Sequence, residues 1–349
     1  MPNVSGPVLK KLLDAGLMSE LHKFMFDGLP VRGALVRLTD AWQEILKRRA
    51  TNTASGPYPL PLQELLGEMA AAGVLMQSGL KLDGALILQI QGDGPVKLAV
   101  VEVSSDVQGD TTGQLSLRAT ATLQAEVAGD ADLSAMVNVH NKGLCAITLD
   151  PKSRKPGQQP YQGVVPLFGD QREPLGRISD VLAHYMLQSE QLPTVLVLAA
   201  NTEVAAGLLI QRMPNQGGRA LKPGQYPDED AYNRISILAD SLQRDELLGL
   251  SADKILHRLF WQEPLLRLPE ATTPIRFACT CNRARVGRML RSLGREEVES
   301  ILTERDNVEV GCEFCGQQYR FDAVDAAQIF AAPSAVDLTA AQGRGANLH

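Results

Sequence analysis

The chain has 349 residues, which is enough for one large hydrophobic core and one or two smaller units. Hydrophobic residues make up 44% of it and charged residues 21%, and no apolar run approaches the roughly 18 residues of a membrane span, so a membrane protein is excluded. The net charge of −6 argues against broad nucleic-acid binding, which needs a basic surface.

The N-terminus, Met1 to Ser5, lacks the basic and then apolar pattern of a secretory signal. We therefore expect a cytoplasmic protein. In that reducing compartment, clustered cysteines are metal ligands or redox-sensing thiols more often than structural disulfides.

Residues 1–225 alternate strand-like and helix-like stretches and predict one α+β domain with a mixed or antiparallel sheet and packed helices. The predicted strands are Val31 to Leu38, Ala85 to Gln91, Val96 to Val103, Leu144 to Leu149, Val195 to Ala199 and Ala206 to Gln211. Gly92 to Pro95 supplies the turn of a hairpin. Ser153 to Gln159 reads as an exposed loop.

Two helices are predicted on this sheet from apolar residues at helical spacing. The first carries Leu62, Leu65, Leu66, Met69 and Met76, and the second carries Val181, Leu182, Tyr185 and Met186. Ser179 is expected to cap the second helix.

Residues 226–273 predict an amphipathic helical linker. One helix is expected to end at Gly249, and Ser251 can cap the next. The apolar face consists of Ile235, Leu238, Leu242, Ile255, Leu256, Leu259 and Phe260. Residues 274–330 form a small cysteine-containing unit, and residues 331–349 have a composition typical of a disordered tail.

Four of the five cysteines form two close pairs, Cys279 with Cys281 and Cys312 with Cys315, separated by 30 residues. Two short-range thiol pairs a moderate loop apart are typical of a tetrahedral Zn²⁺ site. Because a unit of about 55 residues has a marginal core, we expect one zinc ion to hold it folded. If oxidation paired the cysteines locally, the two small rings would constrain the chain little and would not join its halves.

Six arginines and no acidic residue lie between Arg276 and Arg295. They can offset the negative charge of four thiolates and favour the oxidisable form. The alternative is a solvated helix face or a zinc ribbon that binds nucleic acid.

The cysteine pattern, with Cys312-Glu313-Phe314-Cys315-Gly316 followed by Tyr319-Arg320-Phe321, resembles the redox-regulated 33 kDa chaperonin (heat shock protein 33) family. The resemblance covers roughly Phe24 to Phe330. Its other segments are Asp27 with Val31-Arg32-Gly33, Gln91 to Pro95, Tyr161 to Leu167, Tyr185 with Gln188 to Gln191, and Leu256 to Phe260. The loop at Ser153 to Gln159 and the long tail depart from the family pattern.

The resemblance implies an ATP-independent holdase that binds unfolding proteins under oxidative stress, not an enzyme. It implies that Cys279, Cys281, Cys312 and Cys315 bind zinc when reduced and form the disulfides Cys279–Cys281 and Cys312–Cys315 when oxidised. The oxidised protein is then a homodimer that passes clients to ATP-dependent foldases. The client-binding candidates are Ile235, Leu238, Leu242, Leu256, Leu259 and Phe260.

Other candidates receive no catalytic role. Cys145 lies in a strand-like segment and is expected to be a buried, inert thiol. His184 and His257 are not needed beside four cysteine ligands. A thiol-disulfide oxidoreductase that uses the C-x-x-C pair remains an alternative, although Cys312 lacks a thioredoxin-like context.

Overall fold

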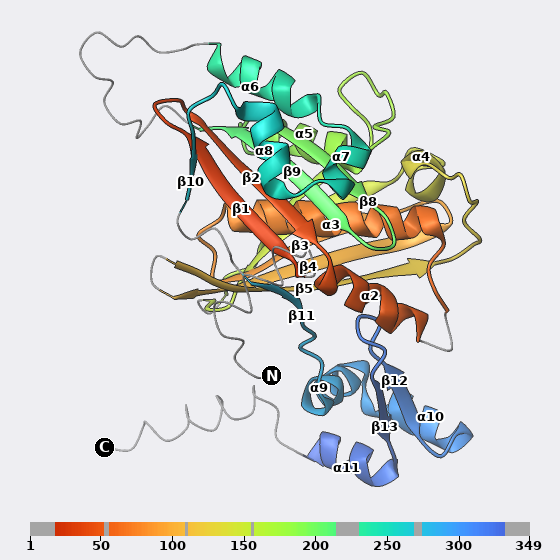
Figure 1. Cartoon of the computed structure of the whole chain (residues 1–349). Helices are drawn as coiled ribbons and strands as arrows, with labels where there is room; N and C mark the ends of the chain where they lie inside the picture. The colour runs from red at the N-terminus through yellow and green to blue at the C-terminus, as the bar shows by residue number, and fades with distance from the viewer. Residues whose placement is uncertain are drawn as a thin grey trace, which may run out of the picture. The chain divides into compact units, whose positions relative to one another are not determined.

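The computed structural model describes residues 18–51, 56–108, 111–154, 157–213, 230–268 and 274–331. The chain divides into two compact units, Met1–Ala278 and Cys279–His349 (Figure 1). The predicted boundary at residues 225 and 226 and the tail after Ala331 lie outside the described residues. Each unit is described by itself.

The first unit contains two sheets, and the first of them, sheet A, has five antiparallel strands in the order β10-β1-β2-β9-β8. These strands are β1 (Glu20–Phe26), β2 (Val31–Leu38), β8 (Thr194–Ala200), β9 (Ala205–Arg212) and β10 (Leu265–Arg267). β2 and β9 are apolar on both faces, which is typical of strands covered on both sides.

Sheet B has six strands in the order β11-β5-β4-β3-β6-β7. These strands are β3 (Gly84–Gln91), β4 (Val96–Gln108), β5 (Thr111–Leu123), β6 (Leu144–Pro151), β7 (Tyr161–Pro166) and β11 (Ile275–Phe277). All neighbours are antiparallel except β11, which runs parallel to β5. The predicted α+β class with a mixed sheet is confirmed.

The core of this unit forms around α3 (Leu60–Ser78), which packs against strands of both sheets (Figure 1). The sequence predicted a helix lying on one sheet, but α3 is apolar nearly all round and buried. Gly67 allows a close approach, because a Cβ there would lie 2.4 Å from the Cβ of Ala200. The other helices of this region are α2 (Asp40–Ala50), α4 (Leu133–Val137) and α5 (Ile178–Gln188).

The opposite face of sheet A is covered by three linker helices, α6 (Ala231–Asp240), α7 (Arg244–Gly249) and α8 (Ala252–Phe260). The predicted helix end at Gly249 is confirmed, but the prediction of a single helix is wrong, because the helix is interrupted after Asp240. A reciprocal capping box between Gln243 and Glu246 starts a new helix there and satisfies its first backbone N–H groups.

The second unit holds α9 (Arg283–Leu293), α10 (Arg295–Glu304) and α11 (Ala323–Ala331) with a two-stranded antiparallel sheet. Its strands are β12 (Val308–Gly311) and β13 (Gln318–Phe321). Among the described residues its core comprises Val286, Leu290, Val298, Val308, Phe321 and Ala326.

All six predicted strands exist, and the Gly92 N–H donates to the Lys97 carbonyl at 2.9 Å to close the predicted hairpin. Strands β1, β5, β7, β10, β11 and β13 were not predicted. The expected cap at Ser179 is wrong: α5 begins at Ile178 and its N-cap is Arg177. Burial of Ile178 in the core outweighs the capping preference of serine.

Candidate metal centre

The two cysteine pairs lie in short loops of the second unit. Cys279 and Cys281 precede α9, whose N-cap Asn282 accepts a hydrogen bond from the Arg285 backbone N–H at 2.8 Å. Cys312 and Cys315 lie in the turn that joins β12 to β13. Gly316 follows with a φ of 73°, a conformation that glycine adopts without steric cost, and its N–H donates to the Cys312 carbonyl at 2.8 Å.

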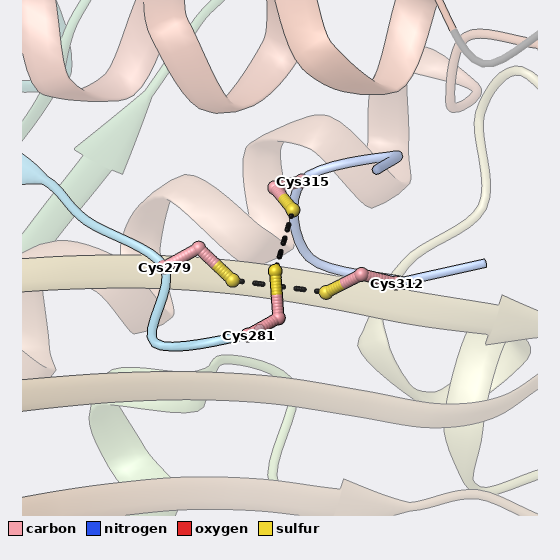
Figure 2. Close-up of side chains that lie close together, drawn as sticks. All are labelled: Cys279, Cys281, Cys312 and Cys315. Atoms are coloured by element: carbon pink, nitrogen blue, oxygen red, sulfur yellow. Dashed lines mark hydrogen bonds between the residues drawn. The ribbon is translucent and has the colours of Figure 1, made fainter. Parts of the chain in front are cut away.

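The four sulfur atoms point toward one another (Figure 2). The Sγ atoms of Cys279 and Cys312 lie 3.7 Å apart, those of Cys281 and Cys315 lie 3.2 Å apart, and all four lie within 4.8 Å. A tetrahedron with Zn–S bonds of about 2.3 Å has edges of roughly 3.8 Å. The donor set and its spacing therefore fit one tetrahedrally bound Zn²⁺.

The thiols differ in acidity when no metal neutralises them. Burial alone would raise the pKa of Cys279, but hydrogen bonds from the Cys281 backbone and from neighbouring thiols outweigh it and lower this pKa to about 7. Burial raises the pKa of Cys312 and of Cys315, and hydrogen bonds with the Cys281 and Cys312 thiols add to the rise at Cys315. Four thiolates together therefore require a bound cation.

Neighbouring side chains orient the two loops. The Tyr319 hydroxyl, on β13, donates to the Cys281 Sγ at 3.2 Å. Arg285 donates to the Thr280 hydroxyl, between the first two cysteines, at 2.7 Å. These contacts restrict the direction of the sulfur atoms, as hydrogen bonds around metal ligands commonly do.

Most of the arginine run is committed to the second unit's own structure. Arg283 donates to the Arg320 carbonyl and to Asp325, at 2.7 and 2.6 Å, and stacks on Phe321. Arg291 donates to the Ile329 carbonyl, and Arg295 pairs with Glu299. The run is therefore not a free basic face of the kind that nucleic-acid binding needs.

The Hsp33 protein family model matches residues 19–322. This chain belongs to the Hsp33 family. A 33 kDa chaperonin of Chromobacterium violaceum is 44% identical over 89% of this chain and 93% of its own length. That of Methylobacillus flagellatus is 43% identical over 90% of this chain and 95% of its own length.

The solved structures agree on the fold. The chain resembles the crystal structure of the 33 kDa chaperonin (heat shock protein 33 homolog) of Thermotoga maritima with a TM-score of 0.67. That likeness covers 89% of this chain and 97% of the other, at 19% identity. The expected Hsp33 resemblance is confirmed, and the Hsp33 family is one of chaperones, which bind unfolded client proteins.

The linker residues that the sequence singled out pack against the outer face of sheet A. Six of the seven residues of the predicted apolar face are buried and Leu238 is partly buried, all in one cluster. In that cluster the Phe260 ring lies 5.2 Å from the Phe26 ring and 6.0 Å from the Phe24 ring, centroid to centroid. Among the described residues, the apolar face of the linker is therefore covered by the outer face of sheet A.

The surface of sheet A beneath the linker was missed by sequence reasoning. It is formed by Phe24, Phe26, Val31, Leu35, Leu208 and Ile210. The signal was present in β2 and β9, whose lack of apolar and polar alternation indicates burial on both faces. The sequence pattern does not reveal that the linker helices are what covers the outer face of sheet A.

Cys145 lies apart from the cluster, on β6, and is fully buried. Burial raises the pKa of its thiol to about 12, which keeps it protonated and unreactive. Among the described residues, the metal-competent group consists of the four cysteines and includes neither His184 nor His257. No helix in the described part of the chain is long and apolar enough to cross a membrane.

Proposed function

We propose that this protein is a redox-regulated, ATP-independent holdase, inactive when its cysteines hold zinc and active after they are oxidised. The observation that carries the proposal is the convergence of four thiols from two loops in a unit whose described part has six buried core residues. Such a core contributes too little to keep the unit folded by itself.

In the reduced state Cys279, Cys281, Cys312 and Cys315 would hold one Zn²⁺. The ion would cross-link the loop before α9 to the turn between β12 and β13. Structural zinc contributes on the order of 10–16 kcal/mol to folding small units, as much as the roughly 5–15 kcal/mol of a whole domain. The fold of the second unit therefore depends on four reduced sulfurs.

Oxidation would convert Cys279 and Cys281 to one disulfide and Cys312 and Cys315 to another. In each pair two thiolates give up two electrons and form one S–S bond, while a peroxide accepts the electrons and, with two protons, becomes two waters. All four metal donors are consumed. A ring of about four residues contributes roughly 2 kcal/mol by chain entropy, which does not replace the metal cross-link.

Unfolding of the second unit would destabilise the linker through the segment of chain that joins the two. β11 ends two residues before Cys279 and pairs with β5 through three residue pairs. Loss of this strand would free the segment that follows α8. The client-binding face would then be Ile235, Leu238, Leu242, Leu256, Leu259 and Phe260, together with the uncovered outer face of sheet A.

The proposal also covers the binding partners and the cellular location. Unfolding proteins are the clients, ATP-dependent foldases receive them afterwards, and the oxidised protein acts as a homodimer. A cytoplasmic location follows from the need for four reduced thiols in the inactive state.

The test is light scattering from a thermally unfolding client protein, with the full chain added either reduced and zinc-loaded or after peroxide treatment at elevated temperature. Suppression by the oxidised sample alone is the expected result. Equal suppression by both samples would refute the switch, and suppression by neither would refute the holdase.

Two further assays address the rival functions. Turnover of a model disulfide by the reduced protein would support an oxidoreductase, although Cys312 follows a strand and does not start a helix. Salt-dependent RNA affinity lost in Arg285→Ala or Arg288→Ala would support a nucleic-acid binder.

A further inference from the structure

A cavity of about 400 Å³ lies in the first unit, lined by strands of both sheets and by the C-terminal turns of α3 and α5. It opens where α3 ends, so the space between the sheets is no longer filled by that helix. Its apolar wall includes Leu75, Leu86, Ile147, Leu149, Met186 and Leu209. The volume is at the small end of the range of ligand pockets, about 300–1,000 Å³.

Arg32 brings a cation to this apolar wall. It lies on the face of β2 that also carries Ala34 and Val36, which belong to the core between the sheets. Burial lowers the pKa of its guanidinium. A charge in such a position is ordinarily paired with an opposite charge.

The partners of Arg32 in the structure are neutral. Its Nε, at 2.9 Å, and its Nη2 donate to the Gln211 side-chain carbonyl, and its Nη1 lies 3.4 Å from the Gly79 carbonyl. Among the residues that the structure describes, no carboxylate is within ion-pairing distance of it. A guanidinium has five N–H donors, so donors remain for a further acceptor.

The cavity lining also includes a carboxylate, that of Glu190. That carboxylate accepts hydrogen bonds from the hydroxyls of Tyr185, at 2.7 Å, and Tyr161, at 3.2 Å. Two hydroxyl donors therefore hold the Glu190 carboxylate.

The cavity also gathers residues that the redox switch leaves without a role. Arg32 and Gly33, and Tyr185 with Glu190, belong to two segments that carry the Hsp33 resemblance, and all four line it. Tyr185 in turn packs against Gly163 of a third such segment, outside the lining, where a Cβ would lie 2.5 Å from the Tyr185 ring. None of these residues is near the cysteines in sequence.

We propose that this cavity binds a medium-chain aliphatic carboxylate, with the carboxylate on Arg32 and the chain along the apolar wall. A planar guanidinium recognises a carboxylate through two parallel hydrogen bonds. The apolar wall rewards each methylene removed from water. The site requires neither zinc nor oxidation, so it is independent of the proposed chaperone switch.

The probe is sodium decanoate, titrated by calorimetry below its micelle concentration into the full chain, reduced and zinc-loaded. One site per chain is expected. Affinity should rise roughly fourfold per methylene from hexanoate to decanoate. Decan-1-ol and decyltrimethylammonium should bind roughly tenfold or more weakly than decanoate, because they lack the charge that Arg32 recognises.

Variants then locate the carboxylate. Arg32→Gln should weaken decanoate binding by roughly 10- to 100-fold and abolish the preference for decanoate over decanol. Arg32→Lys keeps the charge and should retain part of the decanoate affinity. The matched control is Arg37→Gln, because Arg37 is also on β2 but donates to the Leu248 carbonyl at 2.7 Å and does not line the cavity. It should leave decanoate binding unchanged.

Equal affinity for decanoate and decanol in the unmodified chain would overturn the proposal, as would binding of several decanoates per chain. That comparison decides the matter even if Arg32→Gln fails to fold. Displacement of decanoate by a soluble unfolded peptide would also overturn it, because the cavity would then belong to the client surface.

Discussion

The two units of this chain are stabilised in different ways. The first unit surrounds α3 with two sheets and covers sheet A again with α6, α7 and α8, so its cores are large and continuous. The second unit has six buried core residues among those described, and four cysteines whose sulfurs meet. Under the proposed function, oxidation of the cysteines would unfold the second unit and leave the first folded.

The linker helices pack within the first unit, and they carry the proposed client-binding face. They are covered by sheet A, and Arg244 ties α7 to Glu64 of α3 at 2.7 Å. The proposed switch therefore lies in the second unit, and the proposed client-binding surface lies in the first.

The largest expected effect is selective unfolding of the second unit. Cys279→Ser, or metal chelation under reducing conditions, should remove on the order of 10 kcal/mol from its folding. Hydrogen exchange should become fast for residues 279–331 and stay slow for α3. Cys145→Ala is the matched control and should keep one zinc per chain by chelator titration. Full zinc affinity in Cys279→Ser would remove that cysteine from the site.

The next effect concerns the linker. Phe260→Ala deletes a buried ring that contacts Phe24 and Phe26 and should cost about 3–5 kcal/mol of packing. The reduced protein should then show faster hydrogen exchange in α6 to α8 and should suppress client aggregation without oxidant. Trp261→Ala is the control, since the neighbouring Trp261 side chain is 66% exposed. Unchanged exchange in Phe260→Ala would mean that the linker is held by other contacts.

A pH dependence should appear in the first unit. Burial, with opposing effects of Arg244 and Arg177 and reinforcing effects of Glu64 and Asp180, raises the pKa of Glu68 from 4.5 to about 7. The folded state therefore binds this proton more tightly than the unfolded state. The contribution of the protonated Glu68 to the free energy of unfolding is fully present below pH 4.5. It is lost as the pH rises through 7, and the loss is roughly 3 kcal/mol.

Urea unfolding of the first unit between pH 4.5 and 7.5 measures this loss. Glu68→Gln cannot titrate, so its stability should depend less on pH and should exceed that of the unmodified chain above pH 7. Parallel pH profiles for the two proteins would contradict the assignment to Glu68.

The smallest effect tests the tightness of packing in the two units. Gly67→Ala places a methyl 2.4 Å from the Ala200 Cβ and should destabilise the first unit by about 1–3 kcal/mol. Gly287→Ala, on α9, places one at 3.4 Å from Ile329, an ordinary contact, and should stabilise the helix by about 0.5–1 kcal/mol. Thermal unfolding measures both, and equal changes would show that the units are packed alike.

Much of the site could be predicted from sequence because its signal is local. The cysteine pairs are close in the chain, and thiol spacing alone specifies a candidate metal site. The six predicted strands were likewise apolar and bounded by turn residues. The break between α6 and α7 was missed because the apolar residues continue at helical spacing across it. The capping box that starts α7 and the burial of both helices in one cluster favour the interruption.

The amino-acid sequence by itself determined the α+β class, the cysteine set, the apolar face of the linker and the family resemblance, because each depends on residues near one another in the chain. The tertiary structure alone decided that sheet A is buried on both faces, that α3 lies between two sheets, and that Arg32 meets Gln211 beside a cavity. Those features depend on pairings between segments far apart in the chain, such as Arg32 and Gln211, which are 179 residues apart, and local periodicity does not encode them.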